Sequence, residues 1–290
     1  MPTVTQSVFP VMGNTADVTV IGSDHLNEFA RSLLQQLEQL WSRFIPTSDI
    51  SQLNNAAGKA TRVSPHTIQL IKYLIGAYES THGAFDPTLL PVLINIGYGT
   101  SLSHPEHQSI LHNVSSWNIP LSEIGIDEEK QQVQLPAGLT LDPGGLGKGL
   151  AADILATELM DRGATGACVS IGGDIRCIGQ SPQGDFWTIP IETPNATSEL
   201  NTVSFAQGGI ATSWIHAKTW EIPEEDVTMD NPLVMSYTNY AGSDGKGEPP
   251  SRYDLLLKAK NDPKYQLTEE ANNNARDSAT SFARAFGFGV

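Results

Sequence analysis

A glycine-rich segment between an apolar run and an amphipathic helix constrains this chain more than any other stretch. Apolar and polar side chains alternate over Leu139–Leu141, Asp142 follows, and four glycines and one lysine lie within 144–149. A periodic apolar pattern from about Leu150 to Arg162 then indicates an amphipathic helix. The order predicts a strand, a glycine turn and the beginning of a helix.

The chemistry of this turn favours an anionic ligand. Glycines lack a Cβ atom, so a ligand can approach the backbone closely. The beginning of a helix also presents unpaired N–H groups with a partial positive charge, beside which Lys148 adds a full charge. The spacing differs from a P-loop, because Gly149 follows Lys148 where a Ser or Thr is needed, and from a dinucleotide fingerprint. Loop chemistry alone leaves a phosphate site and a structural turn both open.

The charge balance narrows the classes of partner. In 290 residues, 17 Lys and Arg side chains stand against 32 Asp and Glu, for a formal net charge of -15. A chain this acidic repels nucleic acids and anionic lipid surfaces, so both are excluded as partners. With 39% hydrophobic and 17% charged residues, the composition is that of a folded globular protein.

Neither the beginning of the sequence nor its apolar runs indicate a membrane protein. Residues 1–10 lack a basic and apolar signal pattern, and no apolar run reaches roughly 18 residues. We therefore expect no membrane span and a cytoplasmic location, or a periplasmic or membrane-associated one if the N-terminus has been processed. Cys168 and Cys177 lack metal-ligand spacing and are expected to be free core thiols rather than a disulfide.

Hydrophobic periodicity predicts the order of the elements. Long helices are expected at about 25–44 and 65–81, and a short helix at 48–55, where Ser48 and Asp49 can accept from the first free N–H groups. Strands are expected at 8–13, 16–21, 166–171, 186–191, 202–205 and 208–213, and a hairpin within 121–141. The segment 214–275 is polar and loop-rich, and a helical pattern returns at 275–288.

Three histidines lie in the loop-rich stretch 101–119. The spacing of His104, His107 and His112 does not match a pair of metal ligands on one helical face, so these side chains are interpreted as solvated.

Five short motifs occur in a fixed order along the chain, and together they indicate a protein family more strongly than any one of them does. They are Phe9–Gly13, Ser42–Phe44 with Ser48–Asn54, Gly83–Thr88, Asp142–Gly149 and Ile171–Asp174. Together, over roughly residues 8–213 and again near 276, they resemble the ApbE family, whose founding activity is FAD:protein FMN transferase.

The resemblance implies a fold and a reaction. The fold is mixed α/β (α+β), with a mainly antiparallel central sheet and flanking helices, in one domain over 1–290 that includes the divergent segment 214–275. The reaction moves FMN from FAD to a Thr or Ser hydroxyl of a target protein, with Mg²⁺ bridging the pyrophosphate and AMP released. A flavin-acceptor protein is therefore the expected partner.

The resemblance also implies roles for particular residues. The flavin side would be lined by Met12, Phe44, Ala84, Phe85 and Asp86, with Asp142 and Lys148 facing the cofactor. The metal would be bound by the Gly145 carbonyl, Asp277 and Ser281, with Thr280 as a further candidate. Asp277 and Ser281 are spaced i,i+4, so both reach one ion from one helical face.

Without the family context, several of these residues have simpler interpretations. Met12 and Phe44 would be core residues, and Asp86 before Pro87 a turn former. The turn at 172–174 is interpreted as shaping the fold near the site without binding a ligand. Asp153 is interpreted as a first-turn partner of the helix dipole.

One family motif is missing. The family follows Ala-Thr-Ser-Gly with His-x-x-Asp-Pro-x-Thr-Gly, whose His helps to activate the acceptor hydroxyl, whereas Trp214 follows Ser213 here. A hydroxyl needs a base to become a good nucleophile, and His216 and Asp254 are the candidates. Three functions follow: an FMN transferase, a Mg²⁺-dependent FAD pyrophosphatase that gives FMN and AMP, and a non-catalytic FAD-binding protein.

Overall fold

The computed structural model describes residues 2–95, 97–111, 119–191 and 201–211. The predicted loop-rich segment 214–275, the helical pattern at 275–288 and His112 lie outside these residues.

The central sheet is antiparallel throughout. Its strands are β1 (Val4–Val11), β2 (Asn14–Ile21), β6 (Gly166–Ile171), β7 (Asp174–Gly179) and β10 (Gly208–Ala211), in the spatial order β1-β2-β6-β7-β10. The expected mixed fold with a mainly antiparallel sheet is confirmed.

The first two strands are longer than the pattern predicted. Val11 pairs with Asn14, so only Met12 and Gly13 form the turn between them. Both have positive φ, 52° and 64°, as a two-residue type I′ hairpin requires. Asn14 Nδ2 donates to the Met12 carbonyl at 3.2 Å across this turn. The tight turn extends regular pairing over the whole of Val4–Ile21.

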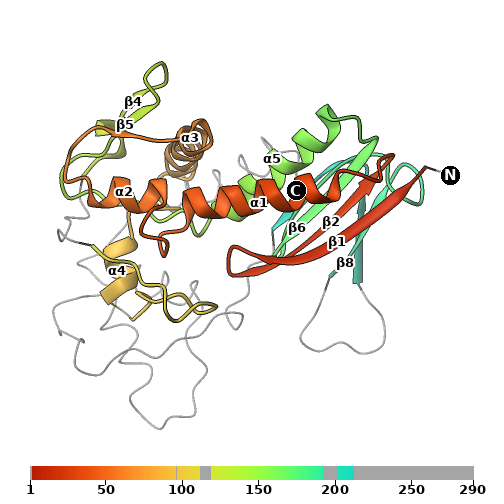
Figure 1. Ribbon diagram of the computed structural model, residues 1–290, viewed down its shortest axis with the longest axis horizontal. Coiled ribbons are helices and arrows are strands. Elements are labelled where there is room, and N and C mark those ends of the chain that lie inside the picture. The colour runs from red at the N-terminus through yellow and green to blue at the C-terminus, as the bar shows by residue number, and fades with distance from the viewer. Residues whose placement is uncertain (1, 96, 112–118, 192–200, 212–290) are drawn as a thin grey trace, which may run out of the picture.

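Two helices, α1 (Asn27–Trp41) and α5 (Gly147–Asp161), lie side by side over one face of the sheet (Figure 1). The helix predicted at 25–44 is confirmed with shorter ends. It buries one face at helical spacing: Ala30, Leu33, Leu34, Leu37 and Trp41. The sheet supplies the opposing surface with Ala16, Val18, Val20, Ala167, Val169 and Ile171, all fully buried.

Helix α5 corrects two details of the sequence prediction. It begins at Gly147 rather than Leu150, so Lys148 and Gly149 belong to its first turn. It is also buried on more than one stripe, through Leu150, Ala151, Ala152, Ile154, Leu155, Ala156 and Leu159. The reason is its position, because α5 contacts β6 and β7 and also α1.

The remaining elements form two groups. The helices α2 (Asp49–Asn55), α3 (Pro65–Ser80) and α4 (Leu90–Asn95) and the strands β4 (Gly125–Asp127) and β5 (Gln132–Gln134) lie beyond the C-terminal end of α1, and β8 (Trp187–Ile191) lies beside the central sheet (Figure 1). Strand β5 lies between β3 (Thr61–Arg62) and β4 in a small sheet, β8 pairs with β9 (Asn201–Phe205), and the 3₁₀ turn η1 spans Leu121–Glu123. The predicted cap of α2 is confirmed, since Ser48 Oγ accepts from the Ser51 N–H at 3.0 Å.

The strand predicted immediately before the glycine turn is absent, because residues 139–141 pair with no strand in the described part of the chain. A side chain takes that role. Asn54 Nδ2 donates to the Leu141 carbonyl at 2.9 Å, and the Leu141 N–H donates to Asn54 Oδ1 at 2.8 Å. The amide satisfies both backbone groups of Leu141, as a neighbouring strand would. It thereby anchors Asp142, the next residue, to α2.

The two cysteines are free thiols, as expected, and face each other across β6 and β7. Cys168 and Cys177 are register partners, with their Sγ atoms 3.0 Å apart. Among the helices that the structure describes, none has the length and apolarity to cross a bilayer.

Candidate active site

A buried arginine forms the centre of the site. Arg43 follows the end of α1, and its side chain is only 4% exposed. Its Nη1 donates to Ser109 Oγ at 2.6 Å and its Nη2 to the Tyr98 carbonyl at 2.9 Å, while Nε lies 3.4 Å from Asp142 Oδ1. An arginine is rarely buried unless such partners replace water, so these contacts explain its position.

Two aromatic rings enclose the same guanidinium. Arg43 Cζ lies 4.1 Å from the ring centroid of Phe44 and 4.6 Å from that of Tyr98, and the two rings meet edge to face at 5.8 Å. Burial lowers the pKa of Arg43, an effect that Asp142 opposes. Burial also raises the pKa of Tyr98, which Arg43 opposes. Arginine nevertheless stays protonated at neutral pH, so Asp142 faces a permanent cation.

The glycine turn is a compact hydrogen-bonded structure. The Asp142 N–H donates to the Pro87 carbonyl at 2.7 Å, and the Gly144 N–H donates to Asp142 Oδ1 at 3.1 Å. The Gly147 N–H then donates to the Pro143 carbonyl at 2.7 Å, which starts α5. The Asp142 side chain, 16% exposed, is therefore oriented by its own turn and by Arg43.

The beginning of α5 has no side-chain cap. Leu146 stands at the cap position and cannot accept a hydrogen bond through its side chain. Among the described residues, none accepts from the N–H groups of Lys148 and Gly149, and none donates to the Gly145 carbonyl. An uncapped helix N-terminus presents donors and a partial positive charge, which suits an anion such as phosphate.

Two ion pairs attach the first turns of α5 to β7. Lys148 Nζ lies 3.1 Å from Asp174 Oδ2, and Asp153 Oδ1 lies 3.3 Å from Arg176 Nε. Residues 174 and 176 share one face of the strand because side chains alternate along it. Asp153 thus has a specific partner beyond the helix dipole, and it follows the first turn rather than lying in it. Lys148 is positioned by Asp174, a residue to which the sequence assigned no ligand role.

The segment 84–88 packs against the glycine turn. A Cβ atom added to Gly145 would lie 3.0 Å from Phe85 Cε2, so the missing side chain is what allows this ring to approach the loop. Asp86 Oδ1 accepts from both the N–H and the Oγ1 of Thr88, at 2.8 and 2.7 Å. These are the contacts of a turn former. Ala84 is exposed beside them.

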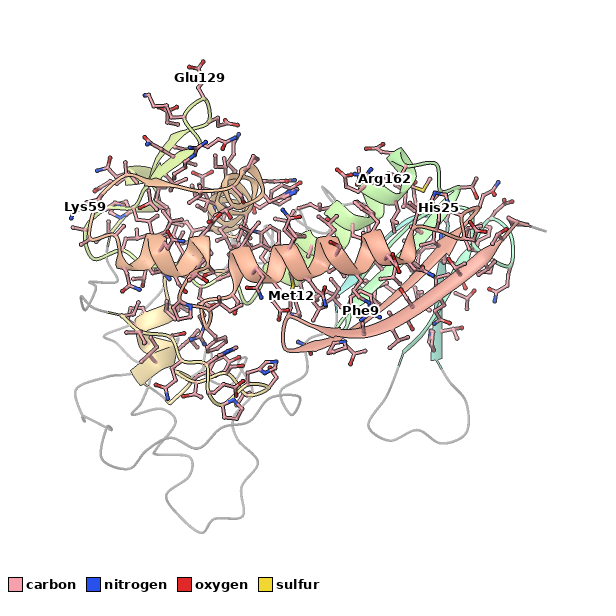
Figure 2. The ribbon with its side chains drawn as sticks, viewed as in Figure 1. Phe9, Met12, His25, Lys59, Glu129 and Arg162 are labelled. Atoms are coloured by element: carbon pink, nitrogen blue, oxygen red, sulfur yellow. The ribbon has the colours of Figure 1, made fainter. Side chains whose placement is uncertain are left out.

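Met12, the first of the candidate flavin-site residues, lies in the turn between β1 and β2. Its N–H donates to Glu38 Oε1 at 2.7 Å, and Figure 2 shows it at the β1–β2 turn beside α1. The same hairpin approaches the 172–174 turn, because the Gly172 N–H donates to the Thr15 carbonyl at 3.2 Å. Through that turn, Met12 is linked to Asp174 and hence to Lys148.

The contacts given above join several of the candidate residues through short-range neighbours. Phe85 packs against Gly145, Lys148 pairs with Asp174, and Asp142 lies beside Arg43, which stacks on Phe44. Met12 contacts Glu38, and Asp86 contacts Thr88 within its own turn. The candidate bases and the other candidate metal ligands lie outside the described residues: His216, Asp254, Asp277, Thr280 and Ser281.

Sequence reasoning did not assign roles to Arg43, Tyr98, Ser109 or Asp174. Arg43 could have been identified, because it is a charged residue at the apolar end of a predicted helix and lies within the Ser42–Phe44 motif. Asp174 lies within the Ile171–Asp174 motif, which gave a similar signal. Tyr98 and Ser109 belong to a loop with no periodicity, and nothing local indicated them.

Comparisons with known proteins agree with the fold. The chain is 27% identical over 203 residues to a protein of Haemophilus influenzae named FAD:protein FMN transferase, covering 64% of this chain and 58% of that protein. The chain thus spans about 58% of the length of that curated relative.

Two solved structures share the architecture. The apo form of flavinyl transferase ApbE from Pseudomonas stutzeri superposes with a TM-score of 0.60 at 25% identity, covering 73% of this chain and 69% of that one. The ApbE protein of Thermotoga maritima gives a TM-score of 0.60 at 22% identity, covering 73% and 70%. The model of the ApbE family matches residues 12–229, most of the sequence, and the chain therefore belongs to the ApbE family.

Proposed function

We propose that this chain is an FAD:protein FMN transferase, which moves FMN from FAD to a Thr or Ser hydroxyl of an acceptor protein and releases AMP. Membership of the ApbE family and the name of the Haemophilus influenzae relative support this activity. The observation that carries it is the uncapped beginning of α5, which lies between Asp142 and the Lys148–Asp174 pair.

The pyrophosphate of FAD is assigned to this helix end. The N–H groups of Lys148 and Gly149 would donate to its oxygens, and Lys148 Nζ would add a positive charge. Asp174 holds that ammonium group in place and reduces its conformational freedom. In a chain with a net charge of -15, such a local donor set is needed to bind a dianion.

The flavin ring is assigned to the apolar side of the same loop. Phe44 and Phe85 offer aromatic faces or edges for stacking, while Met12, Ala84 and Asp86 would border the ring. Arg43 fixes Phe44 through its cation–π contact. Its contact with Asp142 ties this aromatic side to the pyrophosphate side.

The donor set around the loop fits Mg²⁺. The Gly145 carbonyl, without a donor among the described residues, is a hard oxygen ligand of the kind that Mg²⁺ prefers. Asp277 and Ser281, with Thr280 as a further candidate, would supply a carboxylate and hydroxyls of the same class. A Mg²⁺ ion held by these residues would supply positive charge against the negative charge of the pyrophosphate oxygens.

The transfer needs a base from this chain. His216 or Asp254 would take the proton of the acceptor hydroxyl, whose oxygen then bonds to the FMN phosphorus as the bond to the AMP oxygen breaks. Both residues belong to the part of the sequence that replaces the missing family histidine motif.

The test is to incubate the purified chain with FAD and Mg²⁺, with and without a bacterial protein extract as a pool of acceptors. We expect AMP, measured by chromatography, to form only with the extract, together with a fluorescent flavin-labelled band on a denaturing gel. AMP and free FMN formed without acceptor would instead identify a pyrophosphatase. FAD binding without AMP in either mixture would identify a non-catalytic FAD-binding protein.

A further inference from the structure

A tight turn gathers three metal-binding side chains outside the proposed flavin site. In His104-Pro105-Glu106-His107, the His107 N–H donates to the His104 carbonyl at 2.8 Å, and proline occupies the position that favours such a turn. His104 Nδ1 lies 3.3 Å from Glu106 Oε1, and the two imidazole centroids are 5.4 Å apart. One ligand atom from each of the three residues lies within 4.8 Å of the others.

We propose that this turn is a binding site for a divalent transition-metal ion of the Zn²⁺ class. Two imidazoles and one carboxylate form a ligand set that Zn²⁺ uses, with metal–ligand distances of about 2.0–2.2 Å. Ligand atoms around a tetrahedral Zn²⁺ are then about 3.4 Å apart. The three ligand atoms already lie within 4.8 Å of one another, and the His104–Glu106 pair is at 3.3 Å, so only small side-chain rotations are needed to reach that separation.

Accessibility and charge support the assignment. The His104 and Glu106 side chains are 59% and 65% exposed, so a hydrated ion can reach them directly. The net charge of -15 raises the concentration of cations near the surface. Three protein ligands also leave a coordination position for water. Imidazole is a poor ligand for Mg²⁺, so this site differs in chemistry from the magnesium site proposed above.

The turn is the tip of a hairpin that holds Arg43. The Ser101 N–H donates to the His107 carbonyl at 2.9 Å, and the Ser109 N–H donates to the Gly99 carbonyl at 2.8 Å. At the base of the same hairpin, the Tyr98 carbonyl and Ser109 Oγ accept from Arg43. An ion that joins the three side chains at the tip would therefore stabilise the segment that positions the arginine of the site.

The experiment uses the untagged, full-length chain after removal of metal with a chelator, and titrates it with ZnCl₂ by calorimetry. We expect binding that excess MgCl₂ does not displace. The double variant His104→Ala/His107→Ala should weaken Zn²⁺ binding by more than about tenfold, since loss of even a supporting group costs about 10–100-fold. Glu106→Gln should also weaken it. His66→Ala, which removes a histidine from α3, is the matched control and should leave the affinity unchanged.

Hydrogen exchange locates the ion independently of activity. Zn²⁺ should slow exchange of the Ser101, His107 and Ser109 amides in the wild-type chain and not in the double variant. The proposal is overturned if the double variant binds Zn²⁺ as tightly as the wild type, if MgCl₂ competes, or if exchange within 99–109 does not respond. Each of these outcomes leaves the proposed flavin transfer unaffected, because that proposal depends on AMP formation.

Discussion

Replacing Arg43 with methionine should destabilise the protein because it leaves the largely buried carboxylate of Asp142 without its cation. Methionine keeps the length and apolar stem of the side chain but removes the guanidinium. The Arg43 side chain is 4% exposed and that of Asp142 16%, so water can replace little of what is lost. The carbonyl of Tyr98 and the hydroxyl of Ser109 lose their donor as well.

The expected loss is about 3–5 kcal/mol, the usual cost of removing one partner from a buried charge pair. The charge-assisted hydrogen bonds are worth about 1.5–3 kcal/mol each. They are already included in the loss of about 3–5 kcal/mol, because contributions within one network are not additive. For an urea m value of about 3 kcal/mol/M, the unfolding midpoint should fall by about 1–2 M. Circular dichroism during urea unfolding measures the shift.

A double-mutant cycle with Asp142→Asn tests the physical reason. Asparagine removes the charge and keeps the shape, so Arg43→Met should cost less when Asp142→Asn is already present, with a coupling energy of about 1–3 kcal/mol. The exposed pair Lys72–Glu128, at 2.8 Å, is the control, and Lys72→Met with Glu128→Gln should couple by less than about 1 kcal/mol. Additivity of the Arg43 and Asp142 changes within about 0.5 kcal/mol would refute the reasoning.

Three further predictions concern the loop, a helix cap and a thiol. Gly145→Ala places a Cβ atom 3.0 Å from Phe85 Cε2, so it should weaken FAD binding, which is measured by flavin fluorescence. Gly76→Ala is the control, because its new Cβ atom meets nothing within 4 Å. It should leave FAD binding unchanged and raise the stability of α3 by about 0.5–1 kcal/mol. Equal FAD affinities for the two variants would contradict the loop assignment. Ser48→Ala removes the cap bond of α2 and the hydrogen bond from Ser48 Oγ to the Ser42 carbonyl, and should lower the free energy of unfolding by about 0.5–2 kcal/mol in urea. An unchanged value would show that neither bond of this hydroxyl contributes. The hydrogen bond with the Cys168 thiol and burial raise the pKa of Cys177 above its ordinary value, so its thiolate stays scarce. Labelling of Cys177 by a thiol reagent, located by peptide mass mapping, should therefore remain slow from pH 7 to 9 in the folded state and become fast in urea. Rapid labelling of Cys177 in the folded protein would be inconsistent with its burial.

The sequence predicts those parts of the fold that depend on local patterns. The periodicity of α1 and the hydroxyl of Ser48 act over a few residues, and both elements form where expected. The glycine turn and the beginning of a helix after it were also predicted, although α5 starts earlier because Gly147 hydrogen-bonds to Pro143. The predictions that were wrong depended on tertiary contacts. Asn54 replaces the strand partner of Leu141 from 87 residues away, a distance over which a local pattern carries no information.

The candidate site also combines residues that local motifs predicted with residues that only tertiary contacts identify. Motifs identified Asp142, Gly145, Lys148 and Phe85, which the structure places around one loop. The partners that orient them were not predicted. Asp142 faces an arginine nearly a hundred residues earlier, and that arginine in turn requires a carbonyl and a hydroxyl from a loop without periodicity. Long-range pairing of charges arises only when the chain is folded.

The most direct test of the account is where FAD binds. Addition of FAD and Mg²⁺ to isotope-labelled protein should shift the amide resonances of Lys148 and Gly149 most, since their N–H groups are assigned to the pyrophosphate. The opposite end of β7 offers a contrast, because Gly179 and Gln180 line a surface hollow there. Largest shifts at Gly179 and Gln180, with Lys148 and Gly149 unchanged, would contradict the assignment of FAD to the beginning of α5.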